Sequence, residues 1–370
     1  MRRVGMLALL AAGVVIATAL GAPAATAAPA TGTAGAGAGP GATGPACPDQ
    51  AVPPPPPAAT EVGVPAPPPL PVPTEPVGGP DLGCGEIAAT AAPLPPVGAA
   101  SFVLADLDSG AVLATRAPHA RHRPASALKV LTALVALRTL DPATVVEGTP
   151  QDLHIDGSKA GLGPGGRYTV HELLAGLLLN SGNDAAQALS RAVGGDAAMV
   201  AAMSALARDT GALDTRPATP SGLDGPGMAS SAYDLAVLYR VAMRDPLFAS
   251  TIALRSVPFP GYDPEHPGFE LFNSSRLLAG YPGSLGSKSG FTEAARHTLV
   301  AAAERDGRRL VVALMRGENA PEPVWRQAAA LLDWGFAQPA GVTPVGVLVD
   351  SPPPPPAPPP TLPTTPPPVP

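Results

Sequence analysis

Apolar residues recur with a period of two in neighbouring stretches beyond the first hundred residues of the chain. Residues 101–106 and 111–115 are rich in Val, Leu, Phe and Ala, and the turn-forming run 108–110 separates them. This pattern predicts two strands joined as a hairpin. An apolar run with helical spacing follows and predicts a helix that begins at Ser126.

Helical periodicity dominates the next region of the chain. Thr169, with Glu172 three residues later, forms a capping box that predicts the start of a helix ending at Asn180. Further elements are expected in chain order: helices over 184–193, 196–208 and 231–243, strands over 287–291, 298–304 and 310–315, and a helix over 324–334. Strands, then helices, then strands predict an α/β (α+β) fold with an antiparallel sheet, helices on its faces and a separate helical part.

The two ends of the chain differ in composition from residues 98–339, which we expect to form one folded domain. The chain contains 52 Pro and 41 Gly, and these residues are concentrated toward its ends. Residues 28–97 and 340–370 carry too few large apolar side chains for a core, so they are expected to form a disordered spacer and a disordered tail. A spacer through a cell wall and unselected low-complexity sequence both fit this composition.

The first 27 residues have the pattern of a secretory signal peptide. Arg2 and Arg3 precede an apolar run over 6–20, and the small residues at 25–27 offer a cleavage site. The run is short for a membrane span, and an uncleaved N-terminal anchor is the alternative. Export would place the protein outside the cell, in the cell wall or at the outer face of the cytoplasmic membrane.

Two cysteines, Cys47 and Cys84, both lie in the expected spacer. In the oxidising compartment that export implies, a disulfide between them is the interpretation we favour, and two unpaired surface thiols are the alternative. Such a disulfide would cross-link the spacer or hold it against the domain.

The charged residues argue against a nucleic-acid partner. The formal net charge is −6 and no basic stripe is present. The six His form no cluster with Cys or carboxylates, so we expect no metal and no other cofactor. Of the 23 Lys and Arg residues, only Lys129, Lys159 and Lys288 are lysines. A buried lysine can lose its proton and an arginine cannot, so Lys129 and Lys288 are candidates for catalytic or binding residues. The position of Lys159 is better explained by composition and chance.

Three short motifs place nucleophilic and basic side chains on expected elements. Ser126 and Lys129 share one face of a helix start, where a neutral amine can take the proton of a hydroxyl. Residues 181–183 (Ser-Gly-Asn) lie between two helices, and residues 288–290 (Lys-Ser-Gly) lie on a strand. Each motif alone has an ordinary structural explanation: a helix cap, a helix–helix turn and an exposed strand end.

Together and in this order, the three motifs resemble the active-site motifs of penicillin-binding proteins and serine β-lactamases. The sequence around them, at 177–186, 221–225 and 277–292, is similar to that of the low-molecular-mass D-alanyl-D-alanine carboxypeptidases of the peptidase S11 type. The resemblance covers about residues 101–336. It implies a five-stranded antiparallel sheet flanked by helices, an all-helical lobe, and an active site at their junction.

The resemblance also implies roles for the motif residues. Ser126 would be the nucleophile, Lys129 its base, and Ser181 the relay of a proton to the leaving amine. The backbone N–H groups of Ser126 and Phe291 would form the oxyanion hole. The residues expected to bind substrate are Asn183, Lys288, Ser289, Gly290 and Phe291. An arginine should bind the substrate carboxylate, and the candidates are Arg296, Arg316 and Arg326.

The leading hypothesis is a secreted serine-type D-Ala-D-Ala carboxypeptidase that removes the terminal D-alanine from peptidoglycan stem peptides and is inhibited by β-lactam antibiotics. A β-lactamase is the enzymatic alternative, although no convincing equivalent of the deacylating Glu of class A enzymes is evident. A non-catalytic cell-wall-binding protein, with Pro-rich arms as its working parts, is the third hypothesis. Many relatives carry a C-terminal membrane anchor, and no clear anchor is recognisable at 340–370.

Overall fold

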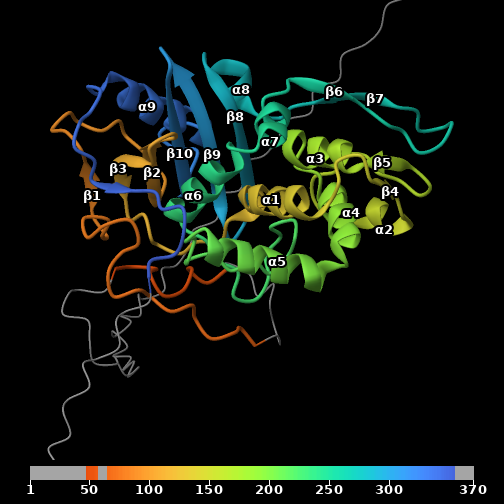
Figure 1. Ribbon diagram of the computed structural model, residues 1–370, viewed down its shortest axis with the longest axis horizontal. Helices are drawn as coiled ribbons and strands as arrows, with labels where there is room; N and C mark the ends of the chain where they lie inside the picture. Colours follow the sequence, from red (N-terminus) through yellow and green to blue (C-terminus); the bar gives the residue numbers. More distant parts are fainter. Residues whose placement is uncertain (1–46, 57–64, 355–370) are drawn as a thin grey trace, which may run out of the picture. The chain divides into compact units, whose positions relative to one another are not determined.

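A computed structural model describes residues 47–56 and 65–354 of the chain. Its largest sheet contains seven strands: β1 (Glu86–Ala88), β2 (Ser101–Asp106), β3 (Ala111–Arg116), β8 (Ser284–Thr292), β9 (Arg296–Arg305), β10 (Arg308–Gly317) and β11 (Gly346–Val347). The strands pair in the order β1-β3-β2-β10-β9-β8, and β11 also pairs with β3. All of these pairs are antiparallel, and β8 lies at one edge of the sheet (Figure 1).

Helices and two small sheets complete the described part of the chain. The small sheets pair β4 (Val145–Glu147) with β5 (Arg167–Thr169), and β6 (Ser256–Phe259) with β7 (Phe269–Phe272). The helices are the 3₁₀ helix η1 (Ala125–Leu128) and α1 (Lys129–Thr139), α2 (Pro150–His154), α3 (Val170–Leu179), α4 (Asn183–Val193), α5 (Asp196–Asp209), α6 (Ala232–Ala242), α7 (Pro246–Ile252), α8 (Arg276–Gly280) and α9 (Val324–Ala337).

The two faces of the large sheet bury separate sets of apolar side chains. Successive residues of a strand point to opposite faces, so Phe102 and Leu104 of β2 pack toward α9, whereas Val103 packs toward α6. The core beneath α6 continues into the helical part, where Leu131 of α1 and Leu177 of α3 are fully buried. In Figure 1 the helices α1, α3, α4 and α5 lie together beside the β8 edge of the sheet. This agrees with the expected helical lobe next to an antiparallel sheet.

The expected strands and long helices between residues 101 and 334 are present, with ends displaced by at most three residues. The five strands predicted from periodicity form the consecutive set β3-β2-β10-β9-β8, as the resemblance implied. The structure adds β1 and β11, which both pair with β3. Each has two or three residues and lies in a Pro-rich flank, so neither carries an alternating pattern. The short elements α2, α7, α8 and β4 to β7 were not predicted either.

Side-chain caps fix the starts of α3 and α6. The hydroxyl of Thr169 accepts a hydrogen bond from the Glu172 N–H at 3.2 Å, and the Glu172 carboxylate accepts one from the Thr169 N–H at 2.7 Å. The predicted capping box at the start of α3 is therefore confirmed. Ser231 caps α6 in the same way, since its hydroxyl accepts a hydrogen bond from Asp234 N–H at 3.1 Å.

Part of the expected spacer is packed against the domain, so the expectation of disorder is wrong for its described residues. Val77 and Leu82 are buried in the core, and β1 pairs with β3. Arg121, whose side chain is 1% exposed, donates hydrogen bonds of 2.7 to 2.9 Å to the carbonyl oxygens of Ala51, Leu70 and Pro71. Pro-rich chain lacks N–H donors for its own carbonyls, and the guanidinium supplies them. We call the described residues 47–56 and 65–85 the N-terminal arm.

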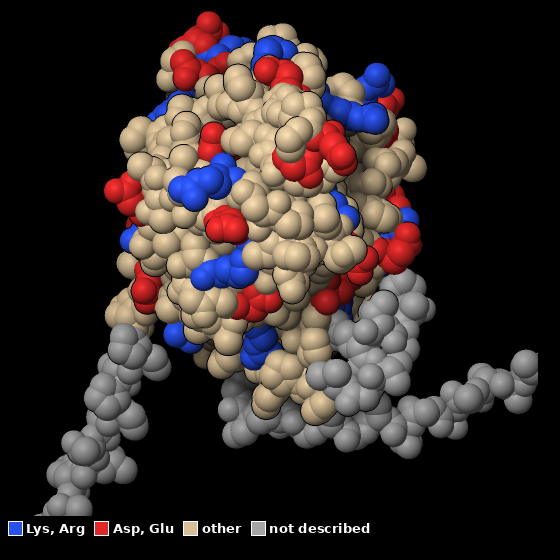
Figure 2. Space-filling model, turned by 90° about the vertical axis from the view of Figure 1, so that its right-hand side faces the viewer, with Lys and Arg blue, Asp and Glu red and all other residues tan. Residues whose placement is uncertain are grey.

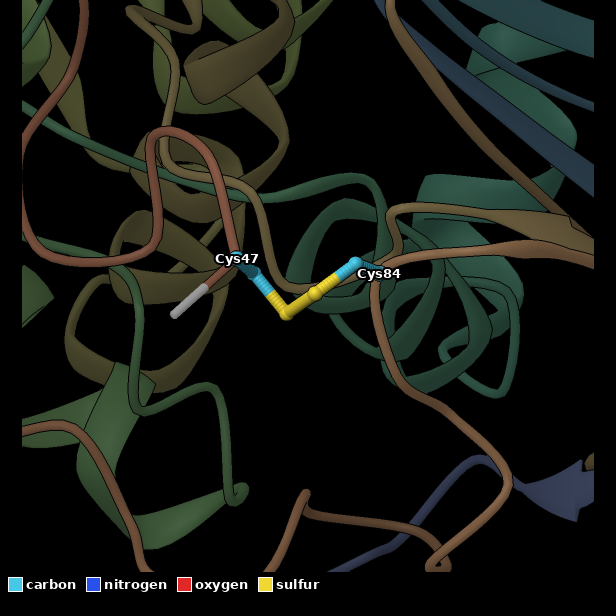
Figure 3. Close-up of a disulfide and its surroundings, with 2 residues drawn as sticks. All are labelled: Cys47 and Cys84. Carbon is cyan, nitrogen blue, oxygen red and sulfur yellow. A yellow bond between two sulfur atoms is a disulfide. The ribbon is translucent and has the colours of Figure 1, made fainter. Parts of the chain in front are cut away.

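The predicted disulfide between Cys47 and Cys84 is present (Figure 3). The two Cα atoms are 5.3 Å apart, within the usual range for such a bond. The bond closes a loop between residues 37 apart in sequence, at the two ends of the arm. The arm is further joined to the domain by the Arg121 N–H, which donates to Asp49 O at 2.8 Å.

The beginning of the expected tail is also packed. Tyr233 of α6 donates a hydrogen bond to Val347 O at 2.8 Å, and Leu348 is buried. The expected disorder at 340–370 is therefore wrong as far as residue 350. The described residues do not include the expected signal peptide at 1–27, the rest of the expected spacer at 28–46 and 57–64, or residues 355–370. Within the described ranges, no helix is both long and apolar enough to cross a membrane.

Candidate active site

Ser126 and Lys129 meet at the junction of the sheet and the helical part. Ser126 lies on η1, which leads directly into α1, and Lys129 is the first residue of α1. The Lys129 Nζ atom is 2.9 Å from the Ser126 Oγ atom. Ser126 is half-buried, whereas Lys129 is fully buried. The predicted proximity of the hydroxyl and the amine is therefore present.

The hydrogen bonds of Lys129 orient its amine toward Ser126. Its Nζ donates to Asn183 Oδ1 at 2.6 Å and to the backbone oxygen of Ser221 at 2.7 Å. Both of these oxygens can only accept hydrogen bonds. A neutral amine has two N–H groups and one lone pair, so when both N–H groups are used in this way the lone pair faces Ser126 Oγ. This is the geometry in which the amine can accept the hydroxyl proton.

The surroundings of Lys129 favour the neutral amine. Burial lowers its pKa well below the usual value, and the nearby positive charge of Lys288 lowers it further. The carboxylate of Asp184 acts in the opposite direction and only partly compensates. A lysine with a lowered pKa is better suited to act as a general base than a lysine with an ordinary pKa.

Lys288 brings the third motif into contact with the second. It lies on β8, and its Nζ donates to Ser181 Oγ at 3.0 Å and to Ser289 O at 2.7 Å. Burial lowers the pKa of Lys288 to about 7. Ser181 lies between α3 and α4 with a φ of 60°, and this left-handed turn separates the two helices at the site.

Two glycines allow the backbone of η1 to pack closely against its neighbours. A Cβ atom on Gly290 of β8 would lie 2.5 Å from the backbone nitrogen of Ser126. A Cβ atom on Gly222 would lie 2.0 Å from the oxygen of Ala125, and Gly222 has a φ of 83°. Any larger residue at either position would displace the serine. The close approach at Gly290 therefore involves η1, and contact of Gly290 with a substrate stays a prediction.

Asn183, which was expected to bind substrate, uses both amide atoms of its side chain for contacts within the protein. Its Oδ1 atom accepts from Lys129, and its Nδ2 atom donates to the backbone oxygen of Asp156 at 2.6 Å. The side chain is 3% exposed. In this structure the amide therefore connects the lysine to the loop at 155–162, and contact with a substrate backbone stays a prediction.

Asp184 holds the same loop, and the sequence analysis did not assign it a role in the site. Its fully buried carboxylate accepts hydrogen bonds from the backbone N–H groups of Ala160, Gly161 and Leu162 at 2.8 to 3.0 Å. Its position in the first turn of α4 gave only the signal of an ordinary helix-start acid. The contact of Lys129 with Ser221 was not predicted either, because it is made by the backbone oxygen of Ser221 and does not depend on the residue type.

Ser289 and Phe291 project from the edge strand on the face opposite to Lys288. Both are exposed, and Phe291 packs against His297 with ring centroids 4.7 Å apart. Ser289 lines a cavity of about 360 Å³ between β8, α8 and α9, and Arg276 and Trp325 also line it. The structure thus separates the side chains of Ser289 and Phe291 from the contacts of the buried lysines, although Lys288 contacts the backbone oxygen of Ser289. Their roles, and the oxyanion hole, stay predictions.

The three candidate arginines differ in their partners. Arg296 pairs with Glu318 at 2.8 Å, and Arg326 pairs with Glu322 at 3.1 Å. Arg316 donates a long hydrogen bond of 3.4 Å to Ala294 O. Arg276 was not considered, yet it lies in the cavity that Ser289 lines. It is exposed and therefore accessible to a ligand. No group of three His, Cys, Asp or Glu that could hold a metal occurs among the described residues.

Comparisons with known proteins show the family to which the chain belongs. A family model described as D-alanyl-D-alanine carboxypeptidase, peptidase S11, matches residues 88–319. The chain belongs to this family. The match includes all three motifs, and it begins after the N-terminal arm.

Relatives in this family come from several bacteria. The D-alanyl-D-alanine carboxypeptidase DacB2 of Mycobacterium tuberculosis is 48% identical over 250 residues, which is 66% of this chain and 84% of the relative. DacF of Bacillus subtilis is 32% identical over 65% of this chain, which spans only 62% of that relative. The fold of the family thus accounts for the centre of the chain, while both its flanks extend beyond the match.

Solved structures show the same fold. The crystal structure of a D-alanyl-D-alanine carboxypeptidase from M. tuberculosis has a TM-score of 0.67 and 46% identity, and the match covers 70% of this chain and 99% of that one. The Streptomyces K15 DD-transpeptidase has a TM-score of 0.63 and 25% identity, with 66% of this chain and all of that chain covered. The sheet, the helical part and the junction between them are therefore those of a DD-peptidase.

Proposed function

We propose that this member of the family is a serine-type D-Ala-D-Ala carboxypeptidase that acts through an acyl-enzyme on Ser126. The observation that carries the proposal is the 2.9 Å contact between Ser126 Oγ and a buried Lys129 amine with a lowered pKa. The substrate is the stem peptide of peptidoglycan, and the product is the peptide shortened by its terminal D-alanine.

In the acylation step, neutral Lys129 accepts the proton of Ser126 while the Ser126 oxygen bonds to the carbonyl carbon of the penultimate D-alanine. The carbonyl electron pair moves to its oxygen, which the N–H groups of Ser126 and Phe291 stabilise. When the pair returns, the C–N bond breaks. The leaving D-alanine takes a proton from the Ser181 hydroxyl, and Lys129 restores that proton through the polar contacts of the site.

In the deacylation step, a water molecule attacks the Ser126 ester. Lys129, neutral again, accepts a proton from the water, and the second tetrahedral intermediate collapses to a carboxylate and a free Ser126 hydroxyl. A β-lactam ring presents a comparable amide, so it should acylate Ser126 by the first step. Slow hydrolysis of that acyl-enzyme would make β-lactams inhibitors.

The test is labelling with a fluorescent penicillin, followed by mass spectrometry of the benzylpenicillin adduct. Wild-type protein should be labelled on Ser126, and Ser126→Ala should not be labelled. Ser109→Ala, at the turn between β2 and β3, is the matched control and should label as wild type does. Equal labelling of wild type and Ser126→Ala would reject the mechanism.

Two further assays separate the alternative functions. Release of D-alanine from a pentapeptide should occur with wild type and be lost in Lys129→Ala, and no release at all would favour a non-catalytic wall-binding protein. Rapid and sustained hydrolysis of a chromogenic cephalosporin would favour a β-lactamase instead.

We also propose that the protein is exported and acts on the cell wall. The signal-peptide pattern at residues 1–27 and the disulfide of the arm support this location. N-terminal sequencing of the mature protein from culture medium and from cell walls tests it, and a retained N-terminus inside the cell would reject it.

A further inference from the structure

A second cavity lies in the helical part, between the loop at 153–162 and the hairpin of β6 and β7. Its volume is about 330 Å³. The residues that give it chemical character are Lys159, Gly161, Tyr262, His266 and Phe269. The hairpin projects at the end of the molecule away from β1 and β3 in Figure 1. Figure 2 shows that end, where acidic and basic side chains are dispersed among uncharged residues.

Flat aromatic surfaces form one side of this cavity. The rings of Tyr262 and His266 stack with centroids 4.3 Å apart and planes inclined by 16°. Phe269 is 43% exposed although it packs against buried Phe259. Rings held by neighbours yet open on one side offer apolar contact without a large loss of side-chain entropy.

Glycines let the opposite wall approach these rings. A Cβ atom on Gly163 would lie 2.5 Å from the ring of Tyr262, and one on Gly161 would lie 3.0 Å from Phe269. The gap between loop and hairpin is therefore fixed by the absence of side chains on the loop. Lys159 stands at the rim, where it is exposed and donates one hydrogen bond to Leu153 O at 2.5 Å. Its remaining N–H groups can bind an anion.

The cavity wall is held by the same residues that order the active site. Asn183, which contacts Lys129, also binds Asp156 O, and Asp184 binds the N–H groups of the residues that line the cavity wall. Gly157 lies against the Asn183 side chain. Gly157 and Gly161 are four positions apart in the sequence, so their Cα atoms are at most about 14 Å apart. Asn183 therefore connects the amine beside Ser126 to the loop that forms one wall of the cavity.

We propose that this cavity binds the amino sugar to which the stem peptide is attached, and that Lys159 binds a carboxylate of the peptide next to that sugar. The inference rests on the proposed function. A pyranose ring has an apolar C–H face that fits an aromatic wall, and polar edges that can remain in water. A pentapeptide stem joins the scissile bond to its sugar through four residues, which span roughly 14 Å when extended. The cavity thereby favours stem peptides on glycan over free peptides.

The experiment compares two substrates with the same pentapeptide, one free and one linked to its disaccharide. Wild type should show a higher kcat/KM on the linked substrate. Tyr262→Ala should lose about tenfold on the linked substrate, which corresponds to ~1.4 kcal/mol, and keep its rate on the free peptide. Phe272→Ala is the matched control, because Phe272 is 68% exposed on the same hairpin and lies outside the cavity. It should change neither rate.

The outcomes separate this proposal from the proposed function. Equal loss on both substrates in Tyr262→Ala, or no loss on either, would overturn the sugar site while the carboxypeptidase stands. Titration calorimetry with the peptide-free disaccharide is independent of catalysis. Heat of binding in wild type that disappears in Tyr262→Ala supports the site even if no D-alanine is released, and its absence in wild type counts against the site.

Discussion

Lys129 and Arg121 are both buried basic residues in the same stretch of chain, but their partners differ. Arg121 donates to the carboxylate of Asp214 at 3.0 Å and to three carbonyl oxygens of the arm. Lys129 has two neutral oxygens and the Ser126 hydroxyl as direct partners, with Lys288 nearby as a second cation. The surroundings of Arg121 supply a negative charge that pairs with its guanidinium, whereas those of Lys129 disfavour the protonated amine.

This difference follows from the chemistry of the two side chains. Arginine keeps its proton when buried, so a buried guanidinium must be paired and fully hydrogen-bonded. Lysine can instead give up its charge, which leaves a nucleophilic lone pair in the protein interior. The same fold uses arginine to fix the arm and, in the mechanism we propose, lysine to activate a hydroxyl. The contrast can be tested by exchanging or removing each cation.

The largest effect is expected when Lys129 is replaced. Lys129→Ala and Lys129→Arg should both lower the rate of acylation by a fluorescent penicillin about 10²- to 10⁴-fold, because neither variant has a neutral amine beside Ser126. Circular dichroism and the thermal midpoint would show whether each variant is folded. A folded Lys129→Arg variant within tenfold of wild type would mean that a permanent charge suffices, and the contrast with Arg121 would fail.

Removal of Arg121 should affect stability rather than chemistry. Arg121→Ala leaves a buried Asp214 with one cationic partner fewer and three arm carbonyls without their donor, so the free energy of unfolding should fall by about 3–5 kcal/mol. Denaturant unfolding measures this change. Arg309→Ala is the matched control, because Arg309 pairs with Asp108 on the surface, and the expected loss is about 0–1 kcal/mol. Equal losses in the two variants would show that the arm contacts contribute little.

The pH dependence of acylation should distinguish the two cations nearest Ser126. The Lys288 pKa is about 7, so its charge, which lowers the pKa of Lys129, is present below pH 7 and lost above it. In Lys288→Met that charge is absent at every pH. The Lys129 pKa is then higher than in wild type at acidic pH, so the acid limb moves to higher pH and the rate below pH 7 should be about tenfold lower than in wild type.

Lys288→Arg provides the matched control for this profile, because arginine stays charged through the whole range. Its acid limb should follow that of wild type, even if the loss of the Ser181 contact lowers all rates by a constant factor. Profiles of identical shape in Lys288→Met and wild type would rule out an electrostatic effect of Lys288 on Lys129.

The same contrast explains what the sequence could predict. Periodicity was sufficient for the five central strands and the long helices, because each buries a regular apolar face. The order of the arm was not predicted, because a Pro-rich segment with few large apolar residues has no sequence pattern that indicates packing. Its order comes from a cross-link, a few buried residues such as Val77 and Leu82, and the guanidinium of Arg121, which lies beyond the arm in sequence. Non-local hydrogen bonds of this kind have no compositional signal.

The candidate site divides in a similar way. The side chains that we propose carry the chemistry, such as Ser126, Lys129 and Lys288, stand in recognisable motifs. The groups that orient them include a backbone oxygen of Ser221 and the carboxylate of Asp184, which binds backbone N–H groups. Contacts made through the backbone depend on the path of the chain in space, so the residue type alone does not reveal them.

The smallest effect concerns Arg276, a basic residue that is neither buried nor part of a recognised motif. It lies in the cavity that Ser289 lines, whereas Arg296 and Arg326 pair with carboxylates of the protein. An exposed arginine contributes modestly to binding an anion, so Arg276→Ala should raise KM for a pentapeptide about three- to fivefold with little change in kcat. An amide-terminated peptide should lose this difference, since it lacks the carboxylate. Arg326→Ala is the matched control and should leave KM unchanged. A rise in KM with Arg326→Ala but not with Arg276→Ala would place the carboxylate site at the start of α9. Arg326 would then have to leave Glu322 when substrate binds, so a cation that is paired in the free protein could also bind substrate.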